Sequence, residues 1–179
     1  MSSPRVSTSS SLTSGAQDLR LEIIRDPGYC GDWMNRYCEN ADTHESLYYC
    51  DVASDDHQLE IHRGSKYGPV IAKSSRCLST PGATDILMSG RSAGHIHYDE
   101  RQARTYFTED GHDYHWNTDM ELLDGKTGAV LAQMSLARDA EARRSGELVI
   151  KEQAFGLRDP IVMSALLVQE RFDEANSCF

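Results

Sequence analysis

Apolar and polar residues alternate in short runs along most of this chain, and turn-forming residues separate the runs. In residues 58–62, Gln-Leu-Glu-Ile-His, the alternation is strict, and a period of two residues is typical of a strand with one buried face. About ten short strands follow one another at intervals of ~8–12 residues, with no helical pattern between them. Such a chain is expected to form a mainly β sandwich or closed barrel. The expected strands lie at residues 21–25, 47–52, 58–62, 70–72, 85–88, 94–98, 103–108, 114–116, 120–123, 129–136 and 147–151.

A different pattern marks residues 159–170, near the C-terminus. Seven of the eight residues from Ile161 to Val168 are apolar, and they do not fall on one stripe. Asp159 suits a helix N-cap, and Pro160 suits the first helical position. The predicted helix is too short to cross a bilayer, which needs ~20 apolar residues. A helix that is apolar all round must be surrounded, and a barrel around it leaves the strands no free edge. We therefore expect a closed antiparallel barrel around this central helix.

Three segments lie outside the strand and helix patterns. Residues 1–18 are rich in Ser and Thr and cannot bury enough apolar surface to offset the entropy of ordering, so we expect a disordered tail. Residues 26–46 are interrupted by Gly, Asn and Asp, and we expect a long loop with one helical turn around residues 32–38. The predicted domain covers residues 19–174, and residues 175–179 form a C-terminal tail.

The charge balance is acidic, with 18 Lys and Arg against 28 Asp and Glu and a formal net charge of −10. An acidic surface argues against general affinity for nucleic acid or for anionic membrane faces, but it leaves room for a local basic patch. We find no apolar signal segment at the N-terminus and no stretch long enough to span a membrane, so we expect an intracellular, cytoplasmic protein, with a peripheral-membrane or nuclear place as alternatives. The five cysteines have no close pairing, and we expect free thiols. The sequence does not indicate an oligomeric state.

Enzymatic chemistry has two candidate sites. Residues 90–94, Gly-Arg-Ser-Ala-Gly, match the nucleophile elbow of serine hydrolases, in which a strained strand-to-helix turn exposes the serine. A strand pattern follows Ser92, so we expect an ordinary turn there. His95 and His97 are two apart on a predicted strand and share a face, as metal ligands would, and His112 and His115 are further donors. No Cys or acidic residue stands beside them at a ligand spacing, so we expect no bound metal and no other cofactor.

Two motifs in the second half of the chain carry a resemblance to a known family. Residues 110–116 read D-G-x-x-Y-x-W, and residues 124–132 read D-x-x-T-G-x-V-x-A, followed by Gly-Glu-Leu-Val-Ile at 146–150 and an apolar helix. This arrangement resembles the tubby C-terminal-domain-like superfamily, which includes tubby proteins, phospholipid scramblases and LURP-one-related proteins, and it is most similar to a small uncharacterised fungal branch. The resemblance covers about residues 47–172. It implies a barrel of roughly twelve antiparallel strands around a central hydrophobic helix.

The motif residues have structural roles in this interpretation. Tyr114 and Trp116 lie two apart on one strand face and are expected to pack together. Leu123, Val130 and Ala132 are expected in the core.

The resemblance also implies a binding function, because tubby proteins bind phosphoinositides through Lys and Arg side chains. Arg138, Arg143 and Arg144 are our candidate ligands, since Arg binds phosphate bidentately; Arg101 and Arg104 form a separate basic pair. We expect a non-enzymatic binding or interaction domain that recognises a phosphoinositide headgroup or a protein partner, the latter at the 26–46 loop. The alternative is a hydrolase that uses Ser92, or a metal ion held by His95 and His97.

Overall fold

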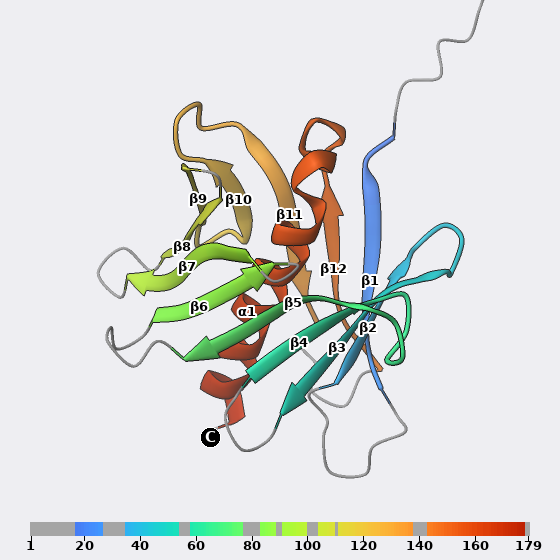
Figure 1. Cartoon of the computed structure of the whole chain (residues 1–179). Coiled ribbons are helices and arrows are strands. Elements are labelled where there is room, and N and C mark those ends of the chain that lie inside the picture. Colours follow the sequence, from blue (N-terminus) through green and yellow to red (C-terminus); the bar gives the residue numbers. More distant parts are fainter. Residues whose placement is uncertain are drawn as a thin grey trace, which may run out of the picture.

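The computed structural model describes residues 17–26, 35–53, 58–76, 83–88, 91–99, 104–109, 111–137 and 143–177. Within these ranges the chain forms twelve strands, then a short 3-10 helix and one α-helix (Figure 1). The strands are β1 (Leu19–Arg25), β2 (Arg36–Asn40), β3 (Ser46–Ala53), β4 (Gln58–Arg63), β5 (Val70–Arg76), β6 (Ala83–Met88), β7 (Arg91–Asp99), β8 (Arg104–Glu109), β9 (His112–Trp116), β10 (Glu121–Asp124), β11 (Val130–Leu136) and β12 (Arg144–Ile150). The helices are η1 (Glu152–Leu157) and α1 (Arg158–Ser177).

The strands pair antiparallel with their neighbours in the chain. The strand order runs β1-β12-β11-β10-β9-β8-β7-β6-β5-β4-β3-β2, the order of a closed barrel. Strand β1 pairs with β12 through Leu21 and Leu148 and with β2 through Ile23 and Cys38, so it joins the first and last parts of the sheet. The predicted mainly β, antiparallel architecture with a C-terminal helix is confirmed.

Helix α1 supplies the centre of the core. Every residue from 161 to 170 is buried, so all sides of this part of the helix are covered. Figure 1 shows α1 descending behind β4 and β5, with β11 and β12 on its other side. Its apolar side chains pack with inward-facing strand residues such as Leu21, Ile61 and Leu148. The central position follows from the sequence, because a helix without a polar face has no side that can face water. Neither helix in the described part of the chain has an apolar run long enough to cross a lipid bilayer.

The prediction of a loop over residues 26–46 is wrong in part. Residues 36–40 form strand β2, which pairs with β1 on one side and β3 on the other; no helical turn forms at residues 35–38, and residues 27–34 lie outside the described ranges. Strand β2 has an inward-facing Arg36 and Cys38 in place of an apolar pair, and both are buried. Its local pattern is therefore weak, and pairing with two neighbouring strands decides its conformation.

The predicted ends of the domain also shift. Helix α1 begins at Arg158, so Asp159 lies in the first turn and is not the N-cap; its carboxylate binds side chains from two strands. The helix continues to Ser177, which places residues 175–177 in the helix and not in a tail. At the other end, Asp18 forms an ion pair with Lys151 and is not part of a free tail. Residues 1–16 lie outside the described ranges.

The motif residues are placed in part as predicted. Tyr114 and Trp116 are both buried and face inward from β9, and Tyr114 stacks on Phe107 with ring centroids 5.0 Å apart. Ala132 is fully buried, but Leu123 and Val130 are only half-buried, which corrects their assignment to the core. Leu122 takes the inward position because it pairs with Trp116 and Ala132. A shift of one residue in the pairing of a strand exchanges its inward-facing and outward-facing side chains.

The turn chemistry of the second motif is present. Asp124 Oδ1 accepts the backbone N–H groups of Lys126 and Thr127 at 2.8 and 2.7 Å. Gly128 closes this turn with φ +71°, a conformation that favours glycine. The motif therefore specifies the β10–β11 hairpin.

Candidate functional site

The predicted arginine site is only partly described. Arg138 and Arg101 lie outside the described residues. Arg143 is exposed just before β12, and its carbonyl accepts the Arg25 N–H at 2.8 Å. Arg144 forms ion pairs with Glu22, at 3.2 Å, and with Glu147. The positive charge of Arg144 is thus balanced by two carboxylates, and an incoming phosphate would compete with both.

The serine motif does not have the backbone context of a nucleophile elbow. Ser92 is the second residue of β7, where it pairs with Leu87, and the strand continues to Asp99. A nucleophile elbow needs a sharp turn from a strand into a helix at the serine. Ser92 stands in extended backbone instead.

His112 and His115 do not share a face of the sheet, and the side chains of His95 and His97 lie outside the described part of the structure. His95 and His97 lie on β7, opposite Asp85 and Ala83 of β6. His112 and His115 are three residues apart on β9, so the alternation of a strand sends them to opposite faces. Among the described residues, no group of three or more His, Cys, Asp or Glu side chains gathers as a metal site would require.

The remaining sites of the sequence analysis have structural surroundings. Burial, with a contribution from Arg104 of β8, lowers the pKa of His115. Cys38 and Cys50 are buried free thiols, and burial raises the pKa of Cys38 to about 12, so it stays a thiol at neutral pH. The other three cysteines are outside the described residues.

A group of polar side chains that the sequence analysis missed meets where α1 begins. We call Tyr48 of β3, Arg63 at the end of β4, and Arg158 and Asp159 of α1 the mouth cluster. The Tyr48 hydroxyl donates to Asp159 Oδ1 at 2.7 Å, and Arg63 Nη2 donates to Asp159 Oδ2 at 2.6 Å. Arg158 Nε lies 3.8 Å from the same carboxylate. The cluster therefore ties the start of the helix to two strands.

The Tyr48 ring lies between these charges. The guanidinium carbons of Arg63 and Arg158 are each 6.0 Å from its centroid, within the range of a cation–π contact. Burial, and then the hydrogen bond to Asp159, raise the pKa of Tyr48. The phenol therefore stays protonated and keeps donating to the carboxylate, which holds Asp159 in place.

A small cleft of about 190 Å³ opens beside the mouth cluster. Its volume is below the ~300–1,000 Å³ of sites for drug-sized ligands, so it fits only a small group. The side chains of Arg63 and Arg158 are 44% and 39% exposed, which leaves both within reach of a ligand. The two guanidinium groups have about ten N–H donors between them, whereas the one carboxylate has only about four acceptor positions, so Asp159 cannot accept from all of these donors. The cleft is lined by Glu45, Ser46, Leu47, Tyr48, Arg63, Gly64 and Arg158.

Little in the sequence indicates this cluster. Arg63 and Asp159 are 96 residues apart, and neither belongs to a spaced motif. The available signals were an arginine before the Gly64 turn and an Arg-Asp-Pro sequence at a helix start. Only the barrel brings them together.

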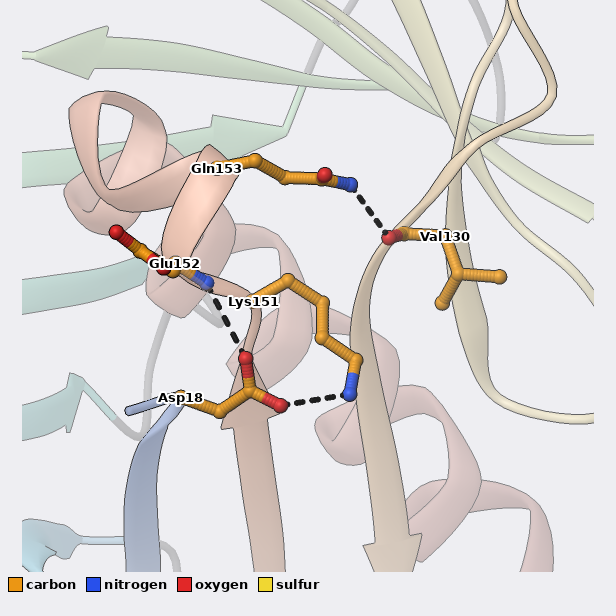
Figure 2. A pocket seen from close by; sticks show the side chains of 5 residues that line it. All are labelled: Asp18, Val130, Lys151, Glu152 and Gln153. Atoms are coloured by element: carbon orange, nitrogen blue, oxygen red, sulfur yellow. Dashed lines mark hydrogen bonds and ion pairs between the residues drawn. The ribbon is translucent and has the colours of Figure 1, made fainter. Parts of the chain in front are cut away.

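A second hollow, of about 510 Å³, lies between the start of β1 and η1 (Figure 2). Its polar groups bind one another: Lys151 Nζ donates to Asp18 Oδ2 at 2.7 Å, and the Glu152 N–H donates to Asp18 Oδ1 at 3.3 Å. Gln153 Nε2 donates to the Val130 carbonyl at 3.3 Å. These bonds fasten η1 to β1 and β11, and we assign this hollow a structural role.

Comparison with known proteins adds information about the fold. No family model matches the chain, and no curated protein does. A protein from Arabidopsis thaliana with a crystal structure is similar to it, with a TM-score of 0.52 and 11% identity over 89% of this chain and 91% of that one. At this identity the similarity concerns the fold alone.

Proposed function

We propose that this chain is a non-enzymatic binding domain of the tubby-like kind, a closed barrel around a central helix, and that its mouth cluster binds a phosphorylated headgroup. The sequence motifs and the helix enclosed by antiparallel strands support the placement in the superfamily. One observation carries the binding proposal: Arg63 and Arg158 reach the same small cleft from different elements.

The chemistry of the cleft suits a phosphate group. The planar guanidinium groups donate in pairs to phosphate oxygens. Arg63 and Arg158 are held beside Tyr48, so less side-chain freedom is lost when a ligand binds. Asp159 and Glu45 oppose an anion here. The cleft is therefore expected to bind phosphate weakly and to discriminate against monovalent anions, which offer fewer acceptors.

The mouth cluster is a better candidate than the predicted Arg138, Arg143 and Arg144 set. Arg144 already contacts two carboxylates, from Glu22 and Glu147. Arg63 and Arg158 share one carboxylate, that of Asp159. The double variant Arg143→Glu/Arg144→Glu tests the earlier candidates in the same assay.

The test is calorimetric titration with a soluble inositol phosphate and with inorganic phosphate, at physiological and high salt. Arg63→Gln and Arg158→Gln should each weaken inositol phosphate binding about tenfold, the effect of losing a charge-assisted hydrogen bond at a half-exposed site. Arg20→Gln is the matched control, because Arg20 is 48% exposed and pairs with Glu147 outside the mouth. Glu45→Gln should strengthen binding by removing an opposing charge.

Two results would contradict the proposal. The first is no binding of any phosphorylated probe to the wild-type protein at physiological salt. The second is an equal affinity of Arg63→Gln, Arg158→Gln and the Arg20→Gln control.

A further inference from the structure

The connection between β4 and β5 carries an aromatic side chain that is largely exposed. Tyr67 is 88% exposed, the most exposed large hydrophobic residue among the described residues. Lys66 Nζ lies 5.1 Å from the centroid of its ring, and Val70 behind it is 38% exposed. We call residues 64–69 the β4–β5 tip; it projects outward from the barrel (Figure 1).

Tyr67 lies in a turn that is held by backbone hydrogen bonds. The Gly68 N–H donates to the Ser65 carbonyl at 2.8 Å, and the Arg63 N–H donates to the Pro69 carbonyl at 3.0 Å. A Cβ on Gly68 would lie 1.9 Å from the Arg63 carbonyl oxygen, so only glycine fits this turn. The backbone therefore holds Tyr67 away from the barrel, where folding gains nothing from its apolar ring.

The tip is also joined to the mouth. The Gly64 N–H donates to the Leu47 carbonyl at 2.8 Å, and both Gly64 and Leu47 line the small cleft. Arg63 of the mouth cluster immediately precedes the tip. A ligand in the cleft would therefore lie next to this hairpin.

The charge of this segment is opposite to that of the chain. Residues 61–72 contain Arg63 and Lys66 but no Asp or Glu, although the whole chain has a formal charge of −10. Asp159 balances Arg63, so Lys66 is the cation that this aromatic tip adds, and a cation beside an exposed ring is complementary to an anionic surface. Tyr is enriched at the headgroup level of membranes, where its ring is buried and its hydroxyl stays in water.

We propose that the β4–β5 tip is a membrane-contact element: Tyr67 enters the interfacial layer of an anionic bilayer while Lys66 faces its headgroups. The inference rests on the proposed function, since the mouth cluster would hold the phosphate of a lipid in the same bilayer. One aromatic ring and one added cation give a weak attachment, so both contacts are needed for stable binding.

Vesicle co-sedimentation, compared with binding of soluble inositol phosphate, distinguishes the membrane contact of Tyr67 from phosphate binding by the mouth cluster. The vesicles contain phosphatidylcholine with phosphatidylserine and a phosphoinositide, and phosphatidylcholine alone serves as the reference. Tyr67→Ala should lower the affinity for anionic vesicles about fivefold and leave the affinity for soluble inositol phosphate unchanged. Leu87→Ala is the control, because Leu87 is a 45% exposed apolar residue on β6. Lys66→Gln should lower vesicle affinity by a similar factor and reduce its salt dependence.

A fluorescent variant gives an independent measurement. Tyr67→Trp should restore vesicle binding, and its emission, after subtraction of the wild-type signal, should shift to the blue with anionic vesicles. Unchanged vesicle affinity in Tyr67→Ala, no blue shift in Tyr67→Trp, or no vesicle binding by the wild type overturns the membrane-contact element. Loss of vesicle binding in Tyr67→Ala, without any soluble inositol phosphate binding, would retain this element and reject the mouth cluster.

Discussion

Removal of the hydrogen bond between Trp116 and Ser164 should show how much this bond contributes to holding the central helix in the barrel. Trp116 Nε1 of β9 donates to Ser164 Oγ of α1 at 3.0 Å, and the two residues are 1% and 0% exposed. The same hydroxyl donates to the Ile161 carbonyl at 2.9 Å. Replacement of Ser164 by Ala removes the acceptor and leaves the indole N–H of a buried residue without this partner.

The expected cost follows from these contacts. A buried donor without a partner costs about 1–3 kcal/mol. Ala is a better helix former than Ser by roughly 0.5 kcal/mol, which offsets part of this cost. The net loss in the free energy of unfolding for Ser164→Ala is therefore ~0.5–2.5 kcal/mol. For a domain of this size that corresponds to a fall in Tm of roughly 1–10 °C.

The assay is urea unfolding followed by far-UV circular dichroism, which does not depend on the tryptophan signal. Ser135→Ala, at an exposed position of β11, is the matched control and should stay within about 0.5 kcal/mol of wild type. Trp116→Phe and the double variant complete a cycle that isolates the pair. The coupling free energy should be about 1 kcal/mol.

Two outcomes would refute this reasoning. In the first, Ser164→Ala and the Ser135→Ala control unfold at the same urea concentration. In the second, the effects of Ser164→Ala and Trp116→Phe simply add. In either case the bond would not help to hold α1, and the position of the helix would depend on apolar packing and on the bonds of Asp159 to Tyr48 and Arg63.

Three further predictions concern stability and the mouth cluster. Leu166→Asp should prevent folding, because Leu166 is fully buried in α1. An unpaired buried carboxylate costs several kcal/mol, and the total free energy of unfolding of a domain is typically ~5–15 kcal/mol. If the variant shows the same Tm as wild type by circular dichroism, α1 is not the central helix. Asp159→Asn should lower Tm slightly and tighten inositol phosphate binding, since Arg63 loses a competing anion; weaker binding in calorimetry would count against the cleft as an anion site. The hydrogen bond from Lys151 lowers the pKa of Asp18, so Asp18 stabilises the fold above its unfolded pKa of ~3.9, and this contribution is lost as the pH falls through the lowered pKa of the folded state. The Tm difference between wild type and Asp18→Asn should be largest near pH 7 and should shrink as the pH falls below ~3.9; a constant difference would exclude this ion pair as its cause.

The sequence alone determined the class of the fold, because its signals are local. Gln58–His62 alternates strictly and forms β4, and the Asp124 turn has its own hydrogen bonds within four residues. The apolar run from Ile161 to Val168 requires burial wherever the helix lies. These patterns predicted a mainly β chain with one enclosed helix.

The tertiary structure decided the elements whose local pattern is weak. Strand β2 contains a buried Arg36, and its extended backbone depends on hydrogen bonds to β1 and β3. Leu122 and Leu123 are equivalent in composition, and only the pairing of Leu122 with Trp116 decides which of them faces the core. A period of two in the sequence shows that successive side chains alternate between the two faces of a strand, but it does not show which of them face the core.

The candidate site belongs wholly to the tertiary structure. Arg63 and Arg158 become neighbours because α1 enters the barrel beside the end of β4, and Asp159 bonds Arg63 across 96 residues of chain. By contrast, the predicted arginines at 143 and 144 are adjacent in sequence, but folding brings two glutamates to Arg144. Charge in a sequence shows which side chains are available, and only the fold determines which opposite charges reach them, since ion pairs act over a few ångströms in space and not along the chain.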